Sequence, residues 1–188
     1  MTVIAALEAL KTEALDPSES KAALAMIRRN IDLESQLIDD LLDLTKITAD
    51  KLQLQLESLD AHRAISNVVE MCASEIGAKN LHFSLALRAH EHHVAADAPK
   101  FQRIIWNLLK NAIKFTGENG RVTISSSNPS PQSLAIGVAD TGIGVEPEIM
   151  ARIFNRFEQG DLSFQRRFGG LGLGLTISKS LAEAHGGT

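Results

Sequence analysis

The hydrophobic pattern of this 188-residue chain changes near residue 50, and this change limits the possible folds more than any other feature of the sequence. Before residue 50, apolar residues recur only at the spacing of amphipathic helices. After it, the two-residue alternation of strands appears between further helical stretches. We therefore expect an α+β protein in two parts, with a helical domain at residues 1–50 and a layered α/β domain at 51–188.

The first part predicts a helical hairpin. Residues 1–14 are rich in Ala, Leu, Glu and Lys, and the run from Asp16 to Glu19 has an acid at the N-cap, Pro at the first helical position and Glu at the third. The second helix carries a broad apolar stripe, whose members are Leu24, Ile27, Ile31, Ile38 and Leu41, widened by Leu37, Leu42 and Leu44. We expect the stripe to be buried against a second hairpin, which makes a homodimeric four-helix bundle. Packing against the rest of the same chain is the alternative.

The second part predicts strands and helices in alternation. In chain order we expect a strand at Leu52 to Leu56, a helix capped by Asp60, strands around 81–87 and Val94, a helix opened by Asp97 and Pro99, a hairpin of 122–124 and 134–138, a short helix, and a last helix that ends at Gly186. This order is typical of a layered sandwich of helices on a sheet.

Composition argues against several classes of function. The chain has 19 basic and 23 acidic residues, and the basic residues are scattered rather than clustered. A nucleic-acid partner is therefore not expected, because neutralising many phosphates needs a concentrated basic surface. No apolar run approaches the roughly 18–20 residues that span a bilayer, so we expect a cytoplasmic chain without membrane contact, whose parent protein is anchored, if at all, through another region. The single cysteine, Cys72, excludes an intramolecular disulfide.

Three polar residues share one side of the helix expected after Pro99. Asn107 and Asn111 lie four residues apart, so both amides project from the same side. The residues expected to face the core on this helix are Phe101, Ile104, Ile105, Leu108 and Ile113. An amide oxygen suits Mg²⁺, which prefers oxygen ligands and keeps water and substrate phosphates around it. Lys114 adds a cation near this side. Two Asn at this spacing are also common on ordinary helix surfaces, so the pair alone leaves both interpretations open.

Three further segments follow in order. Asp140, Gly142 and Gly144 come directly after a strand, where the carboxylate suits the amino group of adenine and the glycines allow a tight turn beside a planar ring; a simple Asx turn is the alternative. Phe154 to Phe157 follow a short helix and are equally consistent with core packing. The glycines of Gly169 to Gly174 open the last helix, where backbone N–H groups and the positive helix end favour phosphate oxygens.

Taken together and in this order, the four segments resemble the ATP-binding domain of two-component sensor histidine kinases. The matches are Asn107 to Thr116 with the N box of that family, Asp140 to Gly144 with its first glycine box, Phe154 to Phe157 with its F box, and Gly170 to Gly174 with its second glycine box. Residues 1–50 resemble the dimerisation and phosphotransfer hairpin, most strongly at 37–44. The resemblance implies a Bergerat-type (GHKL) α/β sandwich with a mixed sheet for residues 51–188.

The resemblance also implies cofactors and roles. ATP and Mg²⁺ are the implied cofactors, with Asn111 as the metal ligand. Asn107, Asn111 and Lys114 are the implied catalytic residues around the phosphates, and Asp140 would bind the adenine amino group. The other implied nucleotide-binding residues are Gly142, Gly144, Phe154, Phe157, Gly170, Leu171, Gly172, Leu173, Gly174 and Thr176. Leu171 stands where many relatives have a small polar residue, so a hydroxyl contact is missing there.

Two departures from the family pattern matter. The phosphoryl acceptor of the family is a histidine on the first hairpin helix, whereas the first histidine of this chain is His62. Relatives also continue beyond the final His-Gly-Gly-Thr stretch into further strands. We therefore expect a chain that begins downstream of its acceptor and lacks the last strands of its sheet, which leaves a sheet edge unpaired.

Two classes of function remain. In the first, the resemblance implies a parent enzyme that transfers the γ-phosphoryl group of Mg-ATP to a histidine and then to an aspartate of a response regulator receiver domain, while this chain alone does not autophosphorylate. ATP-hydrolysing relatives of the fold carry a water-activating Glu at the position of Asn107, and an amide cannot act as that base. In the second class, the chain is a non-enzymatic fragment that dimerises and binds nucleotide.

His90, His92 and His93 stand close together in the sequence. Adjacent residues of a strand point to opposite faces, so we do not expect His92 and His93 to share a metal ion. The trio is interpreted as part of a solvated loop.

Overall fold

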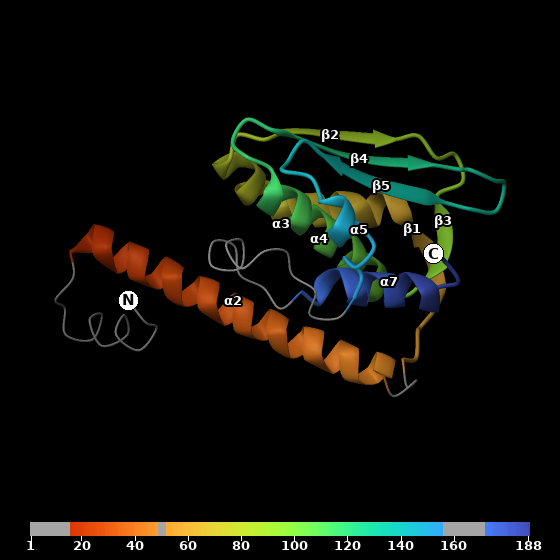
Figure 1. Ribbon diagram of the computed structural model, residues 1–188, viewed down its shortest axis with the longest axis horizontal. Helices are drawn as coiled ribbons and strands as arrows, with labels where there is room; N and C mark the ends of the chain where they lie inside the picture. The colour runs from red at the N-terminus through yellow and green to blue at the C-terminus, as the bar shows by residue number, and fades with distance from the viewer. Residues whose placement is uncertain (1–15, 49–51, 156–171) are drawn as a thin grey trace. The chain divides into compact units, whose positions relative to one another are not determined.

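The structure is a computed structural model that describes residues 16–48, 52–155 and 172–188 (Figure 1). The chain divides into two compact units, Met1–Asp50 and Lys51–Thr188. The described elements are α2 (Pro17–Thr48), β1 (Glu57–Asp60), α3 (Ala61–Ala78), β2 (His82–Leu87), β3 (His93–Ala96), α4 (Ala98–Phe115), β4 (Arg121–Ser127), β5 (Ala135–Asp140), α5 (Pro147–Met150) and α7 (Gly174–Ala184). The first arm of the predicted hairpin lies outside the described residues.

Helix α2 begins with a reciprocal cap. The Asp16 Oδ1 atom accepts hydrogen bonds from the backbone N–H groups of Ser18 at 2.7 Å and Glu19 at 2.8 Å, and Glu19 Oε2 accepts one from the Asp16 N–H at 3.1 Å. This capping box confirms the predicted helix start. Within the predicted stripe Ile27 is buried, whereas its exposed members are Leu24, Ile31, Ile38, Leu41 and Leu42. The side chains of Leu37 and Leu44 lie outside the described part, and the homodimeric bundle stays a prediction.

The strands of the second unit form two sheets. Strands β2, β4 and β5 form a mixed sheet in which β2 and β4 are parallel and β4 and β5 antiparallel. Strands β1 and β3 form a separate antiparallel pair. The mixed sheet and the α+β class confirm the predicted fold.

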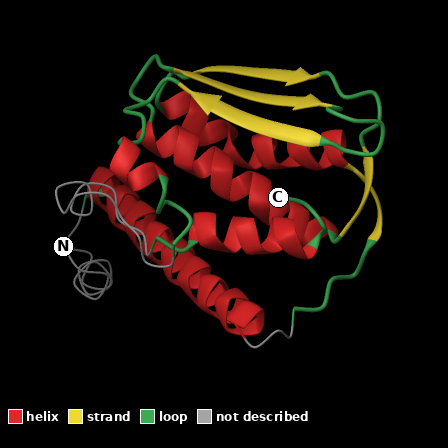
Figure 2. Ribbon diagram, turned by 45° about the vertical axis from the view of Figure 1, so that its right-hand side comes forward, coloured by secondary structure: helices red, strands yellow, loops and turns green. Residues whose placement is uncertain are grey.

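Helices α3 and α4 cover one face of the mixed sheet, and α7 packs against α4 on the side away from the sheet (Figures 1 and 2). The core lies between the sheet and the helix pair α3 and α4. Its fully buried members include Ile65 and Val68 of α3, Leu109 of α4, and Val122 and Ile124 of β4. Alternate residues of β4 are buried, as expected for a strand with one covered face. Helix α4 is therefore the central helix, with the sheet on one side and α7 on the other.

Two local predictions were wrong. Residues 52–56 do not form a strand. The partner strand β3 has only four residues, and all of them pair with Glu57–Asp60. The chain leaves the sheet directly after β3, because Asp97 caps α4. The inward face predicted for α4 was wrong at Ile104 and Leu108, which are only half-buried, whereas Ile105 and Ile113 are buried as predicted. The buried Leu109 was missed. The pattern alone could not select this face, because α7 covers a second side of the helix.

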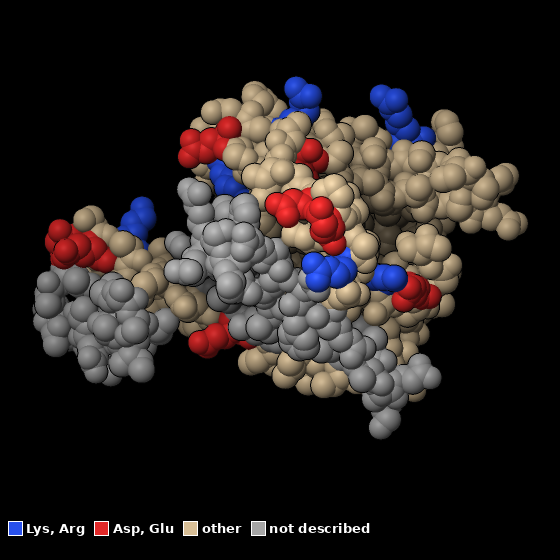
Figure 3. All heavy atoms as spheres, in the orientation of Figure 1, with Lys and Arg blue, Asp and Glu red and all other residues tan. Residues whose placement is uncertain are grey.

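None of the described helices is both long enough and apolar enough to cross a membrane. On the face seen in Figure 3, acidic and basic side chains of the described residues are interspersed, without a large patch of either sign.

Candidate functional site

Asn107 is the buried link between α4 and α7. Its side chain is 4% exposed, and its amide nitrogen donates hydrogen bonds to the Gly174 carbonyl and to Ser178 Oγ, both at 3.2 Å. A Cβ atom added to Gly174 would lie 3.6 Å from the Asn107 amide. The N box and the second glycine box are therefore in direct contact at the first turn of α7.

Asn111 and Lys114 continue along α4 from this point. Asn111 lies one helical turn beyond Asn107 and is half-buried. The Lys114 ammonium group lies 4.8 Å from the centre of the Phe115 ring, and burial lowers the pKa of Lys114. A partly desolvated ammonium group gains most from an anionic partner, because such a partner offsets the cost of its burial.

The first glycine box lies against the C-terminal end of α4. A Cβ atom added to Gly142 would stand 2.5 Å from the Phe115 carbonyl oxygen, so only glycine fits there without displacing backbone. Gly144, two residues later, has φ of +72°, a conformation that favours glycine. The chain after β5 therefore passes close beside the end of the N-box helix.

Asp140 is exposed at the end of β5, where the sequence predicted it. Its Oδ1 atom accepts a hydrogen bond from the Gly142 N–H at 2.8 Å, which is the Asx turn considered above. The second carboxylate oxygen, Oδ2, takes no part in this turn. The turn and an adenine contact are thus compatible, and the adenine contact stays a prediction.

The F box is tied to the second glycine box. Thr176 is buried on α7, and its hydroxyl group donates a hydrogen bond to the Phe154 carbonyl at 2.8 Å. Phe154 itself is 43% exposed, and the Lys179 ammonium group lies 5.7 Å from the centre of its ring. Core packing is therefore not the role of the Phe154 side chain.

The glycine-rich segment before α7 is described only from Gly172 onward. Gly172 has φ of +70°, and Leu173 is buried directly before the helix. Phe157, Gly170 and Leu171 lie outside the described residues. We call the region formed by Asn107, Asn111, Lys114, Asp140, Gly142 and Gly174 the nucleotide face, after the ligand that the sequence predicts for it.

Two contributors to this face have no sequence signal. Ser178 shares the Asn107 amide nitrogen with Gly174, and nothing in its surroundings in the sequence distinguishes it from other helix serines. Lys79 donates hydrogen bonds to the carbonyl groups of Ile113 at 2.6 Å, Lys114 at 3.0 Å and Thr116 at 2.9 Å. Its charge suits the negative end of α4 and holds the end of the N-box helix in place.

A second polar cluster lies away from the nucleotide face. It consists of Asp60, His62, His92 and His93, and we call it the histidine corner. The expectation that His92 and His93 point apart was wrong: their ring centres are 4.9 Å apart. His92 precedes β3, so strand alternation does not apply between these two residues.

Comparison with known proteins finds a family match for the second unit. Residues 96–188 match the family described as histidine kinase-, DNA gyrase B-, and HSP90-like ATPase. The signal transduction histidine-protein kinase BarA of Escherichia coli (strain K12) is 36% identical over 184 residues, which cover 95% of this chain and 20% of BarA. The circadian input-output histidine kinase CikA of Synechococcus elongatus is 35% identical over 154 residues, which cover 81% of this chain and 20% of CikA.

A solved structure agrees with these relatives. Full-length ShkA, crystallised in complex with AMPPNP, superimposes with a TM-score of 0.74 at 30% identity, covering 92% of this chain and 35% of ShkA. The chain spans about a fifth of the length of BarA and of CikA.

Proposed function

Residues 96–188 belong to the histidine kinase-, DNA gyrase B-, and HSP90-like ATPase family, and from that premise we propose that the chain binds Mg-ATP for phosphoryl transfer to a histidine. The chain carries the ATP-binding region of a histidine kinase. Its parent is proposed to pass the phosphoryl group onward to an aspartate of a response regulator receiver domain. The helical unit is proposed to form a homodimer through the exposed apolar stripe of α2.

The observation that carries this proposal is the linkage of all four sequence motifs around α4 and α7. Asn107 bonds to Gly174, Gly142 abuts the carbonyl of Phe115, and Thr176 bonds to the carbonyl of Phe154. Segments far apart in the chain thus meet in one region, although each is unremarkable alone. Convergence of glycine turns, amides and a cation is what recognition of a nucleotide requires.

The residues present fit ATP and Mg²⁺. When bound, ATP supplies the phosphoryl group and Mg²⁺ neutralises charge on the phosphates. Asn111 offers an amide oxygen to the metal, and Lys114 offers a partly desolvated ammonium group to the phosphates. Gly142 keeps the backbone free of side-chain atoms beside the end of α4, and Asp140 presents Oδ2 to an adenine amino group.

Asn107 supports the kinase over the hydrolase within this family. Its two amide hydrogens bond the Gly174 carbonyl and Ser178 Oγ, and the carbonyl can only accept. A glutamate at this position would place a carboxylate against that carbonyl and leave it unpaired. The buried amide therefore holds the second glycine box without supplying a general base for water.

The test is a calorimetric titration of the chain with a non-hydrolysable ATP analogue, with and without Mg²⁺. Wild type is expected to bind, and more tightly with Mg²⁺. Asp140→Asn keeps the Asx turn, because its amide oxygen still accepts from Gly142, but it replaces Oδ2 with an amide that donates. We expect this variant to bind about ten- to a hundredfold more weakly, the range for a lost charge-assisted hydrogen bond.

Asp60→Asn is the matched control, because it makes the same charge change in the histidine corner. It is expected to bind the analogue as wild type does. Equal binding by wild type and Asp140→Asn would contradict the adenine contact of Asp140, and no binding by the folded wild-type chain would contradict the nucleotide proposal as a whole.

The acceptor histidine is proposed to come from outside this chain, because residues 1–50 contain no histidine. Incubation of the chain with labelled ATP is therefore expected to leave no acid-labile phosphate on it. This sequence feature also favours a second candidate function, a dimerising fragment that binds nucleotide without turning it over. Phosphorylation in trans of a separate hairpin that carries an acceptor histidine would favour the kinase over this candidate.

A further inference from the structure

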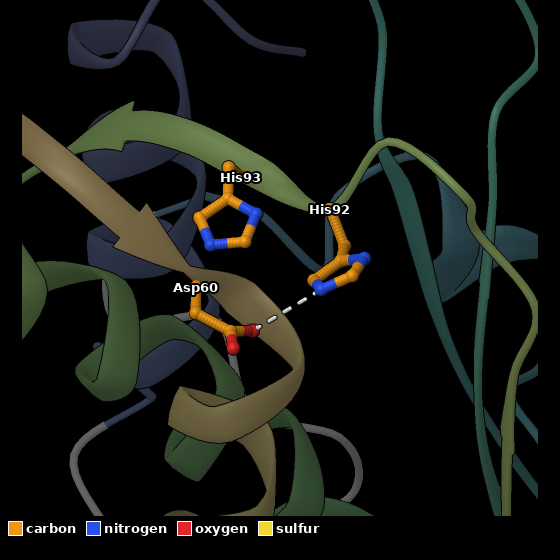
Figure 4. Close-up of side chains that lie close together, drawn as sticks. All are labelled: Asp60, His92 and His93. Carbon is orange, nitrogen blue, oxygen red and sulfur yellow. Dashed lines mark ion pairs between the residues drawn. The ribbon is translucent and has the colours of Figure 1, made fainter.

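Three potential metal ligands converge in the histidine corner. Asp60 ends β1, His93 begins β3 and pairs with Asp60 in the antiparallel register, and His92 directly precedes it. Their ligand atoms all lie within 4.8 Å of one another, and Figure 4 shows the three side chains pointing toward one another. Two imidazoles and a carboxylate from two chain segments therefore face one shared space.

The tautomer of His92 directs a lone pair into that space. Its Nδ1 atom lies 3.1 Å from the His90 carbonyl, which only accepts, so Nδ1 carries the hydrogen. In the neutral ring, Nε2 is then an acceptor, and it lies 3.7 Å from Asp60 Oδ1. A backbone carbonyl that fixes the far nitrogen of an imidazole is the usual support of a histidine metal ligand.

The ring of His92 is held in place from one face. His62 stacks on it with ring centres 4.2 Å apart and planes 4° from parallel, and His62 Nε2 is itself 2.8 Å from Ser126 Oγ. Stacking covers the face of the ring but leaves its edge accessible, where the lone pair of Nε2 lies. The orientation of the ligand nitrogen is thus set before any ion binds.

The backbone around the three ligands is also fixed. The Ala61 N–H donates to the His92 carbonyl at 3.0 Å, which joins the start of α3 to the start of β3. Glu91 exchanges two hydrogen bonds with the Asn128 side chain, at 3.1 Å and 2.8 Å. The loop that carries His92 is therefore anchored to α3 and to the turn between β4 and β5.

We propose that Asp60, His92 and His93 form a binding site for a divalent transition-metal ion of the Zn²⁺ type. Bonds of about 2.0–2.2 Å place neighbouring ligands about 3.3 Å apart in a tetrahedral zinc site. The His92 to Asp60 distance of 3.7 Å is close to this value and too long for a direct hydrogen bond. His93 is exposed, so its ring has room to rotate and bring a ring nitrogen to the same distance from the other two ligands.

The donor set selects the class of ion. Imidazole nitrogen suits Zn²⁺, Co²⁺, Ni²⁺ and Cu²⁺, whereas Mg²⁺ prefers oxygen ligands in near-ideal octahedral geometry. Asp60 and His92 are about one-third exposed, with side-chain values of 37% and 29%, so a water molecule has access to the fourth position. This site is separate from the magnesium ligand proposed at Asn111 and does not depend on the proposed function.

The experiment is a calorimetric titration of the 188-residue chain with Zn²⁺, at neutral pH and without nucleotide. Wild type is expected to bind one ion. His93→Gln removes an exposed ligand, and Asp60→Asn removes a carboxylate while keeping a good N-cap for α3. Each variant is expected to bind Zn²⁺ at least about tenfold more weakly, because loss of even an outer-shell partner has that effect.

His82→Gln is the matched control, an exposed histidine at the start of β2, and it is expected to bind Zn²⁺ as wild type does. Zn²⁺ is also expected to raise the melting temperature of wild type and of His82→Gln, while Mg²⁺ at the same concentration leaves it unchanged. Circular dichroism verifies that each variant is folded. The proposal is overturned if wild type binds no Zn²⁺, or if both ligand variants bind it as tightly as wild type.

Discussion

The nucleotide face and the histidine corner lie in the same unit but are built in different ways. The nucleotide face is assembled from short segments whose residue types already indicate nucleotide binding, such as the glycines around Asp140 and before α7. The histidine corner is assembled by strand pairing, which places Asp60 opposite His93. Local motifs therefore identify a site only when the residues that form it lie close together in the sequence.

The two regions also share a foundation, because α3 starts at the histidine corner and packs against α4, which carries the nucleotide face. Substitutions in the common core should therefore weaken both regions together. Substitutions at one region should leave the other intact.

The largest expected effect comes from the shared core. Leu109→Ala removes a side chain that is 0% exposed between the sheet and the helices, and it is expected to lower the free energy of unfolding by about 2–5 kcal/mol. Urea denaturation measures this change. Leu85→Ala, at a position that is 43% exposed on β2, is the matched control and should change it by no more than about 0.5 kcal/mol. A similar loss in both variants would contradict the assignment of the core.

The next effect distinguishes the two asparagines of the nucleotide face. Asn107→Ala leaves the Gly174 carbonyl and Ser178 without their shared donor, and it should lower the free energy of unfolding by about 1–3 kcal/mol. Asn111→Ala, one turn along the half-buried side of α4, should change stability little and instead remove the Mg²⁺ dependence of nucleotide binding. Denaturation and calorimetry together separate the two roles. Equal changes of stability and of Mg²⁺ dependence in both variants would show that the two asparagines do not have separate roles.

The smallest effect separates the two roles of Asp60. Its Oδ1 atom accepts a hydrogen bond from the Arg63 N–H at 3.1 Å and so caps α3. Asp60→Ala should lower the melting temperature slightly, and Asp60→Asn should not, because Asn caps a helix about as well as Asp. Both variants should bind Zn²⁺ at least about tenfold more weakly than wild type. Retention of Zn²⁺ binding by Asp60→Asn would assign this carboxylate to capping alone.

The same hydrogen bond predicts a pH dependence. The Arg63 N–H lowers the pKa of Asp60 below its ordinary value, and His92 and His93 act in the same direction when they are protonated. The folded state therefore prefers the ionised carboxylate, and this contribution is present above the ordinary carboxyl pKa and is lost as the pH falls through the lowered value. The stability difference between wild type and Asp60→Ala should accordingly shrink in acid.

Most elements of the fold were predictable from the sequence. Caps at Asp16, Asp60 and Asp97 marked helix starts because their carboxylates bond to backbone N–H groups within three residues. The β4 and β5 hairpin was predictable from its alternation and its loop. The predicted strand at Leu52 to Leu56 failed because alternation gives no information on the length of the partner strand.

The helix caps, the change of hydrophobic pattern near residue 50 and the four motifs could be predicted, because each depends on residues within a few positions of one another. The fold of the whole chain was needed to show that Asn107 is buried against α7, that Lys79 holds the end of α4, and that His92 and His93 turn toward Asp60. These contacts join residues that are between about 30 and 70 positions apart. Their geometry follows from helix packing and strand register, which depend on the whole chain and cannot be predicted from any short segment.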